Sequence, residues 1–313
     1  MNISVVIPVF NSETTLDALV ERLHPVLEQA AESYEVVFVD DGSSDRSWGK
    51  ISHLHSRYSW IRGYSLMRNY GQNNALLYGI RSARYEIIVT MDDDLQHPPE
   101  EIPTLIKTLR EGYDVVYGTP KKEQHGFWRD MASRITKIIM KRAMGVHVAR
   151  NISSFRIFRS PIKNAFVNYD GPFVSIDVLL TWGTTNFAAI PVRHESRVDG
   201  ESNYTLGKLL NHALNLITGF STVPLRLASL AGFGFSLFGG CILIYVVGKY
   251  FIYGSSVPGF PFLASIISIY AGVQLFCLGI IGEYLARIHY RNMARPYCVV
   301  RETLESDAES QTD

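Results

Sequence analysis

Cysteine is scarce in this chain, and neither sign of charge is in excess. The 313 residues include three cysteines, and 30 basic residues balance 30 acidic ones. Cys241 and Cys277 fall inside long apolar runs and Cys298 lies beyond them, so no disulfide framework is expected. The zero net charge argues against nucleic acid as the main partner. No basic segment with a cleavable apolar stretch opens the sequence, so no secretory signal is expected, and we find no internal repeat.

Charged residues are absent from two stretches, 227–248 and 261–282. Each is long enough to cross a hydrocarbon core of ~30 Å as a helix. Glycines within them favour membrane helices over buried soluble ones, because small residues let helices pack closely. The link between the stretches contains Gly254, Pro258 and Gly259, which predicts the turn of a helical hairpin. Because Lys and Arg flank the outer ends of the pair, we expect both termini in the cytoplasm.

Short apolar runs alternate with amphipathic segments over the first 120 residues, which is typical of a mostly parallel sheet covered by helices. The predicted strands are 3–9, 35–40, 62–66, 87–91 and 114–117, and the predicted helices are 14–32, 44–58, 73–83 and 102–110. In open sheets of this kind, ligands bind beyond the carboxyl ends of the strands. Three polar clusters lie there, at 8–13, 40–45 and 92–96.

The most informative cluster follows the fourth predicted strand and reads DDDLQHPPE. Successive side chains of an extended segment point to opposite sides, so Asp92, Asp94 and Gln96 can converge while Asp93 turns away. Their oxygen atoms are hard ligands that suit Mg²⁺ or Mn²⁺, with diphosphate oxygens completing the shell. A solvated turn or a helix cap is the alternative for an aspartate triplet. His97 could join a manganese site, although an exposed loop histidine is the favoured interpretation.

The other two clusters favour contacts to a nucleotide. Asp40 and Asp41 end a buried strand, where carboxylates can accept hydrogen bonds from a base N–H or ribose hydroxyls. The serines that follow them, or Asp45, can equally cap the next helix. The first strand ends with Pro8, which stiffens the exit, and Phe10, which can pack near the base.

Two amphipathic segments lie beyond the sheet. Residues 128–145 predict a basic amphipathic helix, which can lie in the headgroup layer of an anionic membrane or be an ordinary surface helix. A second candidate helix, 206–220, leads into the first apolar stretch. The tail from Glu302 onward is acidic and polar, so we expect it to be disordered.

Taken in order, the segments PVFNSE, VDDGSSD, RNYGQ, MDDDLQHPPEEI and RVDGESNY resemble glycosyltransferase family 2. More narrowly, the chain is similar to the polyprenyl-phosphate branch of that family. This branch includes dolichyl-phosphate mannose synthases and the bacterial transferases that charge undecaprenyl phosphate with glucose or aminoarabinose. The segments TVPLRLASLAG, GIIGEYLARI and ARPYCV extend the resemblance over nearly the whole chain.

The resemblance implies an inverting transfer of a sugar from a nucleotide diphosphate donor to a polyprenyl phosphate such as undecaprenyl phosphate. UDP-glucose or a UDP-linked amino sugar is favoured as donor, and a GDP donor is possible. The expected architecture is a cytoplasmic, Rossmann-like GT-A catalytic domain (1–205), a juxtamembrane amphipathic helix (206–226), two transmembrane helices (227–285) and a cytoplasmic tail (286–313). We expect a multi-pass protein of the inner membrane that forms homo-oligomers, with a tetramer favoured by the resemblance.

Site residues are also implied. Asp92 and Asp94, with Gln96 assisting, are expected to hold Mg²⁺ or Mn²⁺, and Asp94 and Arg197 are the expected catalytic residues. The expected nucleotide-binding residues are Pro8, Phe10, Asn11, Asp40, Asp41, Gly71, Gln72, Asp92 and Asp93. The acceptor phosphate is expected at Arg129, Ser133, Lys137, Arg197, Ser202 and Tyr204, since guanidinium offers bidentate geometry to phosphate. Any of these cations could be a surface charge, and Tyr204 could simply close a turn.

Two departures from the family pattern matter. Many relatives have Glu directly after the Asn of the first motif, whereas here Ser12 precedes Glu13, which puts Glu13 in doubt as a nucleotide contact. Several relatives also carry an acidic residue before Phe-Arg, where this chain has Ser154. Asp177 could substitute for it as a base, although a structural helix aspartate is favoured.

Two other functions were weighed. A processive polysaccharide synthase would show a Gln-x-x-Arg-Trp motif and more spans, and the sequence has neither. A non-catalytic membrane protein that binds a nucleotide or a lipid would not need Asp92, Asp94 and Gln96 intact. A lipid phosphate is already anionic near neutral pH and needs no strong base to become a nucleophile, so the transferase is the favoured function.

Overall fold

The computed structural model describes residues 1–120, 152–171, 174–195, 223–253, 259–293 and 296–305. The chain divides into two compact units. One comprises Met1–Leu210 together with Arg295–Asp313, and the other is Asn211–Ala294. The last segment of the chain therefore belongs to the same unit as the amino-terminal sheet.

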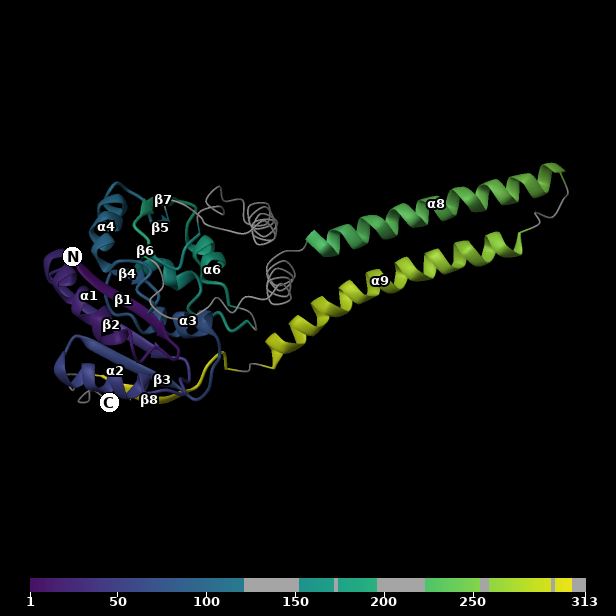
Figure 1. Cartoon of the computed structure of the whole chain (residues 1–313). Helices are drawn as coiled ribbons and strands as arrows, with labels where there is room; N and C mark the ends of the chain where they lie inside the picture. Colours follow the sequence, from purple (N-terminus) through teal and green to yellow (C-terminus); the bar gives the residue numbers. More distant parts are fainter. Residues whose placement is uncertain (121–151, 172–173, 196–222, 254–258, 294–295, 306–313) are drawn as a thin grey trace. The chain divides into compact units, whose positions relative to one another are not determined.

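The first unit alternates strands and helices (Figure 1). Its strands are β1 (Asn2–Val9), β2 (Ser33–Asp40), β3 (Ile61–Leu66), β4 (Ile87–Thr90), β5 (Val115–Pro120), β6 (Arg156–Arg159), β7 (Phe187–Val192) and β8 (Val300–Leu304). Its helices are α1 (Leu16–Ala30), α2 (Ser47–Arg57), α3 (Gln72–Ser82), α4 (Ile102–Arg110) and α6 (Ile176–Gly183), with 3-10 helices η1 (Pro99–Glu101) and η3 (Ser160–Ala165).

The strands form one eight-stranded sheet in the order β7-β5-β6-β4-β1-β2-β3-β8. Strands β4, β1, β2 and β3 run parallel, and β5 and β7 are parallel to each other. Strand β6 is antiparallel to both β4 and β5, and β8 is antiparallel to β3. The carboxyl ends of β1, β2, β3 and β4 consequently meet at one edge of the sheet, which is where ligands bind in open α/β folds.

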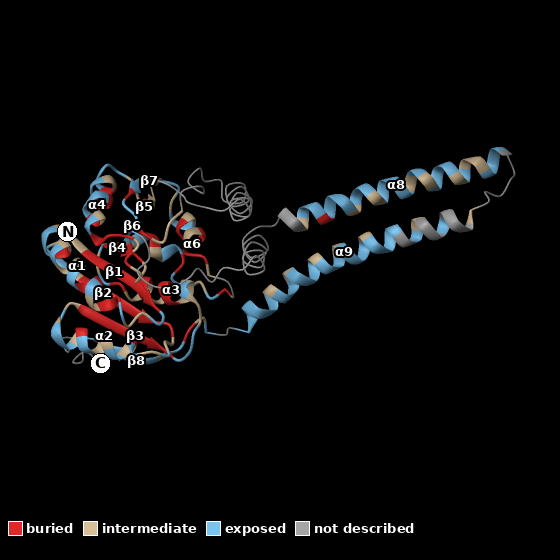
Figure 2. Cartoon of the chain, in the orientation of Figure 1, coloured by how far each residue is buried: buried red, intermediate tan, exposed pale blue. Residues whose placement is uncertain are grey.

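The apolar runs of the sequence are strands buried on both faces. Residues 3–9 of β1 are all buried, and buried strands appear in red across the sheet in Figure 2. On one face, side chains such as Val5 and Phe38 pack with α1, α2 and α4. On the other face, Val6 and Val37 pack with α3 and α6. Strands covered on both faces lack polar alternation, which explains the continuous apolar runs.

The five predicted strands and four predicted helices are all present, with ends within three residues of those expected. Strands β6, β7 and β8 were not predicted. The expectation of a disordered tail is wrong for residues 302–305, because Glu302 and Leu304 lie in β8 and Glu305 directly follows it. The acidic side chains of this segment are held by Trp48 and Arg62.

The second unit holds two long helices, α8 (Val223–Tyr253) and α9 (Phe260–Asn292). Within them, Leu225–Ile252 and Ile269–Asn292 have mean hydropathies of 2.1 and 1.5 and are long and apolar enough to cross a membrane. Their apolar side chains are largely exposed (Figure 2). The predicted amphipathic helices at 128–145 and 206–220 lie outside the described residues.

Candidate active site

Loops after β1, β2 and β4 meet at the carboxyl edge of the sheet. Asn11 adopts a positive φ of 54°, and its side-chain oxygen accepts a hydrogen bond from the Ser44 amide at 2.8 Å. In the same loop, the Phe10 amide and the Ser12 hydroxyl donate to Asp93 Oδ2 at 3.4 and 2.5 Å. The loop after β1 therefore joins the acidic turn after β2 to the aspartates after β4.

The carboxylates of Asp40 and Asp41 are buried at the end of β2. Asp41 accepts the backbone amides of Tyr70 and Gly71 at 2.7 and 2.8 Å, and Asp40 accepts the Ser43 amide at 3.2 Å. Burial raises the pKa of both carboxyls, and these hydrogen bonds oppose the rise. Each carboxylate can accept more than the bonds described, since its two oxygens carry about four acceptor sites.

The turn after Asp41 requires glycine. Gly42 has φ +70°, and a Cβ there would lie 2.5 Å from the Arg68 carbonyl carbon and 2.7 Å from the Asn69 nitrogen. The loop 68–72, which carries the RNYGQ motif, therefore packs directly on this turn. Gly71 and Gln72, both predicted to contact the nucleotide, thus lie in a loop that contacts Asp41.

The three aspartates after β4 make different contacts. Asp92 accepts hydrogen bonds from Gln72 Nε2 at 2.6 Å and Ser154 Oγ at 2.5 Å. Asp93 turns toward the loop after β1, and Asp94 accepts the Gln96 amide at 3.1 Å. Ser154 therefore helps to orient the Asp92 carboxylate.

Burial and neighbouring charges both act on the middle aspartate of the acidic cluster. The pKa of Asp93 is raised to about 6, chiefly by burial, with the Ser12 hydrogen bond opposing and the charges of Asp92 and Asp94 adding to the rise. Within the described residues, no group of three or more His, Cys, Asp and Glu side chains is arranged to hold a metal ion. Asp92, Asp94 and Gln96 supply only oxygen donors, which is the ligand type that Mg²⁺ and Mn²⁺ prefer.

His97 is buried, with 7% of its surface exposed, so the prediction of an exposed loop histidine is wrong. Its ring stacks on Phe155 at 5.4 Å between centroids and meets His194 edge-on at 5.0 Å. Burial and the neighbouring His194 lower its pKa to about 4, so it is neutral at pH 7. The aromatic neighbour Phe155 lies far along the chain, which is why local sequence patterns do not predict the burial of His97.

A backbone contact joins the loop after β4 to the segment that ends at Glu195. The Glu195 amide donates to the Gln96 carbonyl at 2.9 Å, and the Glu195 carboxylate pairs with Arg22. Asp177, by contrast, has a structural role at the start of α6. It forms an ion pair with buried Arg156 and accepts a hydrogen bond from Tyr117.

The structure thus gathers the predicted residues of the amino-terminal domain at one edge. These residues are Pro8, Phe10, Asn11, Asp40, Asp41, Gly71, Gln72, Asp92, Asp93, Asp94 and Gln96. Sequence reasoning did not assign Ser12 or Ser154 a site role, since single serines in loops carry no distinctive pattern. The predicted acceptor residues lie outside the described part of the chain: Arg129, Ser133, Lys137, Arg197, Ser202 and Tyr204.

The sheet with acidic loops at its carboxyl edge is a Rossmann-like GT-A fold. Solved structures of glucosyl-3-phosphoglycerate synthase from Mycobacterium tuberculosis share it. The complex with phosphoglyceric acid has a TM-score of 0.51 and 18% identity, covering 69% of this chain and 78% of that one. The complex with Mn²⁺, UDP-glucose and phosphoglyceric acid has a TM-score of 0.50 and 19% identity, covering 69% and 77%. At these identities the likeness concerns the fold alone.

Sequence comparison identifies the family. The family model described as glycosyl transferase family 2 matches residues 4–166. Three bacterial undecaprenyl-phosphate 4-deoxy-4-formamido-L-arabinose transferases are 35% identical to this chain. They come from Shewanella sediminis (98% of this chain and 93% of that protein), Serratia proteamaculans (96% and 94%) and Pseudomonas aeruginosa (94% and 88%). The chain belongs to glycosyl transferase family 2 and is a glycosyltransferase, which confirms the resemblance noted in the sequence.

Proposed function

We propose that this enzyme transfers a sugar from a nucleotide diphosphate donor to a polyprenyl phosphate, with inversion at the anomeric carbon. The observation that carries the proposal is the meeting of Asp40 and Asp41 with the Asp92–Asp94 cluster at one edge of the sheet. Relatives that match almost the whole chain are named as undecaprenyl-phosphate transferases, which supports the same acceptor class here. A UDP-linked amino sugar or UDP-glucose is the favoured donor.

The donor would lie against the loops after β1 and β2. Phe10 is 48% exposed, so its ring can stack on a base. Asp40 and Asp41 have acceptor capacity for base or ribose hydrogens. Gln72 holds Asp92 in place from the neighbouring loop at 2.6 Å, which would keep one carboxylate oriented toward the diphosphate.

A divalent cation fits the acidic cluster, because crowded carboxylates repel one another and a cation would relieve that repulsion. Asp92 and Asp94, with the Gln96 side chain, would hold Mg²⁺ or Mn²⁺. Mg²⁺ commonly uses one or two carboxylates and takes its other ligands from water and substrate phosphates. When bound, the metal would stabilise the charge of the departing diphosphate.

The acceptor phosphate would be held by cations beyond the described residues. Arg197 is our first candidate. The other residues proposed to contact the acceptor phosphate are Arg129, Ser133, Lys137, Ser202 and Tyr204. Two helices able to cross a membrane would keep the enzyme beside its lipid substrate. We propose a multi-pass inner-membrane protein with the catalytic unit and both termini in the cytoplasm, assembled as a homo-oligomer.

A donor screen tests the function. The full chain is purified in detergent and incubated with undecaprenyl phosphate, Mg²⁺ or Mn²⁺, and a panel of UDP- and GDP-sugars, with lipid products read by mass. We expect one lipid-linked monosaccharide, formed only with a divalent cation and abolished by EDTA. Formation of a polymer would instead support a processive synthase, and absence of any lipid product across the panel would contradict the proposal.

Arg197 can be tested separately from the donor site. Arg197→Ala should raise the KM for lipid phosphate at least about tenfold, because a charge-assisted bidentate contact is lost. The KM for the donor should change little. An unchanged lipid KM would remove Arg197 from the acceptor site.

A further inference from the structure

Residues 296–305 come after α9 in the chain and lie at the edge of the sheet of the first unit. We call this segment the carboxyl-terminal strap. Its last part is β8, which pairs antiparallel with β3 from Leu66↔Val300 to Gly63↔Leu304. The nucleotide-site residues named above do not include any part of the strap, although β3 continues directly into the loop 68–72.

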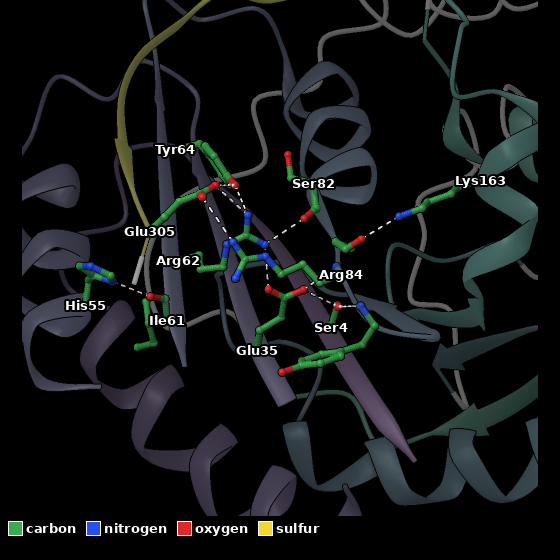
Figure 3. Close-up of polar contacts among 12 residues, drawn as sticks. Ser4, Glu35, His55, Ile61, Arg62, Tyr64, Ser82, Arg84, Lys163 and Glu305 are labelled. Atoms are coloured by element: carbon green, nitrogen blue, oxygen red, sulfur yellow. Dashed lines mark hydrogen bonds and ion pairs between the residues drawn. The ribbon is translucent and has the colours of Figure 1, made fainter. Parts of the chain in front are cut away.

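One end of the strap is fixed at the amino ends of the strands (Figure 3). Glu305 accepts hydrogen bonds from Arg62 and Tyr64 at 2.8 and 2.6 Å and forms an ion pair with Arg84. Arg62 is buried and also pairs with buried Glu35 at 2.8 Å. The charge-assisted hydrogen bond between Glu305 and buried Arg62 helps to hold the strap in one register against β3.

The middle of the strap hydrogen-bonds the backbone of Met67, the last residue before the loop 68–72. The Met67 amide donates to the Val299 carbonyl at 2.9 Å, and Arg301 donates to the Met67 carbonyl at 2.9 Å. The pairing register shifts between Ser65 and Leu66, which leaves Arg301 as an extra residue in β8. A bulge of this type re-aims a side chain, and here it accompanies the contact of Arg301 with the backbone of its neighbour.

The strap also contacts the helix that follows the loop. The Tyr297 ring lies under the Arg81 guanidinium of α3, 4.5 Å from ring centroid to Cζ. Cys298 is buried among side chains that include Leu66 and Leu77. Burial raises the pKa of the Cys298 thiol to about 11, with the Asp41 charge among the smaller contributions. The strap therefore holds both sides of the loop and reaches the vicinity of Asp41.

The loop 68–72 is the part of the site that these contacts would control. Its Tyr70 and Gly71 amides bind Asp41, and its Gln72 side chain binds Asp92. The backbone at residues 68–69 also packs on Gly42, where even a methyl group would clash. A small displacement of Met67 would thus shift the hydrogen-bond donors of two carboxylates, Asp41 after β2 and Asp92 after β4.

We propose that the carboxyl-terminal strap is a positioning element of the nucleotide-sugar site, with Arg301 as the positioning residue that fixes the loop 68–72 through Met67. The inference rests on the proposed function for its kinetic consequence. Its structural part, the ordering of the loop, can be measured without any substrate. Within the described part of the chain, Arg301 acts through its hydrogen bond to the Met67 carbonyl.

Arg301→Ala in the full chain tests the proposal, with Arg301→Lys as the conservative variant. We expect the alanine variant to raise the KM for the nucleotide sugar about three- to tenfold while kcat and the lipid KM stay within about twofold, a split typical of lost uniform binding, in which the ground state and the transition state are weakened equally. The lysine side chain keeps a hydrogen-bond donor, so Arg301→Lys should raise the KM for the nucleotide sugar less than Arg301→Ala does. Amide hydrogen exchange of residues 67–72 should be faster in the alanine variant.

Trp48→Phe provides the matched control, because Trp48 holds the same strap through Glu302 at 2.8 Å but makes no contact with Met67 within the described residues. It should leave the donor KM and the exchange of 67–72 unchanged. Unaltered exchange of 67–72 in Arg301→Ala would overturn the inference, whether or not a donor has been found. Faster exchange would support it even if the donor screen gave no product, in which case only the proposed function would fail.

Discussion

The two ends of the parallel strands β1–β4 differ in how their charged side chains are arranged. At the amino ends, Glu35 and Arg62 are both buried and directly paired, and Glu305 joins them (Figure 3). At the carboxyl ends, the carboxylates that follow β2 and β4 lie at one edge of the sheet. The contacts that the described residues make with them come from backbone amides and from serine and glutamine side chains.

This difference separates stability from function. Each charge of a buried pair compensates the other. Removal of one partner leaves an uncompensated buried charge, which destabilises the fold. At the carboxyl ends, burial is the main cause that raises the pKa of Asp93 to about 6, and the charges of Asp92 and Asp94 add to the rise; carboxyl groups perturbed in this way are common at functional sites. Substitutions at the two ends should therefore fail in different ways.

The largest effect on activity is expected from Asp94→Asn. Loss of a metal-binding carboxylate should lower kcat at least about 100-fold, the range seen when an electrostatic stabiliser of the transition state is removed. The free energy of unfolding should change by about 0.5 kcal/mol or less, because the amide oxygen can still accept the Gln96 amide. Product formation and thermal unfolding are measured on the same preparation. Undiminished turnover would refute the metal assignment.

At the opposite end, Arg62→Met should mainly destabilise the protein. The change leaves Glu35 buried without its cation and should lower the free energy of unfolding by about 3 kcal/mol. Urea or thermal unfolding followed by circular dichroism measures the loss. Adding Glu35→Gln should recover part of it, since the uncompensated charge is then gone. Equal stability of Arg62→Met and the wild type would show that the pair is not a stabilising feature of this end.

Glycine substitutions can sharpen the comparison at the functional end. Gly42→Ala should cost about 1–2 kcal/mol for the positive φ and should also raise the donor KM, because its Cβ would press on the loop 68–72. Gly112→Ala is the control, since Gly112 has φ +107° but nothing lies within 4 Å of its Cβ position. The control should lose stability without a change in donor KM. An equal donor KM in the two variants would show that the position of the loop 68–72 does not affect donor binding.

The smallest effect is a pH dependence at the amino ends. Hydrogen bonds from Tyr64 and Arg62 lower the pKa of Glu305. A lowered carboxyl pKa stabilises the fold above the ordinary glutamate value and loses that contribution as pH falls through the folded-state value. Glu305→Gln should therefore reduce stability by about 0.5–1 kcal/mol at pH 7, with the difference shrinking below about pH 4. A pH-independent difference would indicate a packing effect instead of a charge effect.

The parallel core and the position of the site could be predicted from sequence because both depend on local patterns. Buried strands give continuous apolar runs, and the acidic turns follow those runs directly, as at Asp40 and Asp92. The topology then requires the two turns to meet at one edge. The residue types after β4 were also enough to predict oxygen ligands for a divalent metal.

The remaining features depend on partners far along the chain. The acidic residues of the tail look solvated in sequence, yet Glu302 binds Trp48 and Glu305 binds Arg62. His97 looks like a loop residue, yet Phe155 and His194 cover it. In each case the polar or charged residue type predicts exposure. The residue is instead held by a contact that forms only once the sheet has folded.

The position of β8 also bears on biosynthesis. Translation delivers β3 early, but the strand that covers its outer edge emerges only after both apolar helices have left the ribosome. Until then β3 presents unpaired backbone groups, which are a template for aggregation. A shortened fragment that ends before β8 would carry the same open edge, so expression of Met1–Leu210 alone should be improved by joining residues 296–305 back to it through a linker.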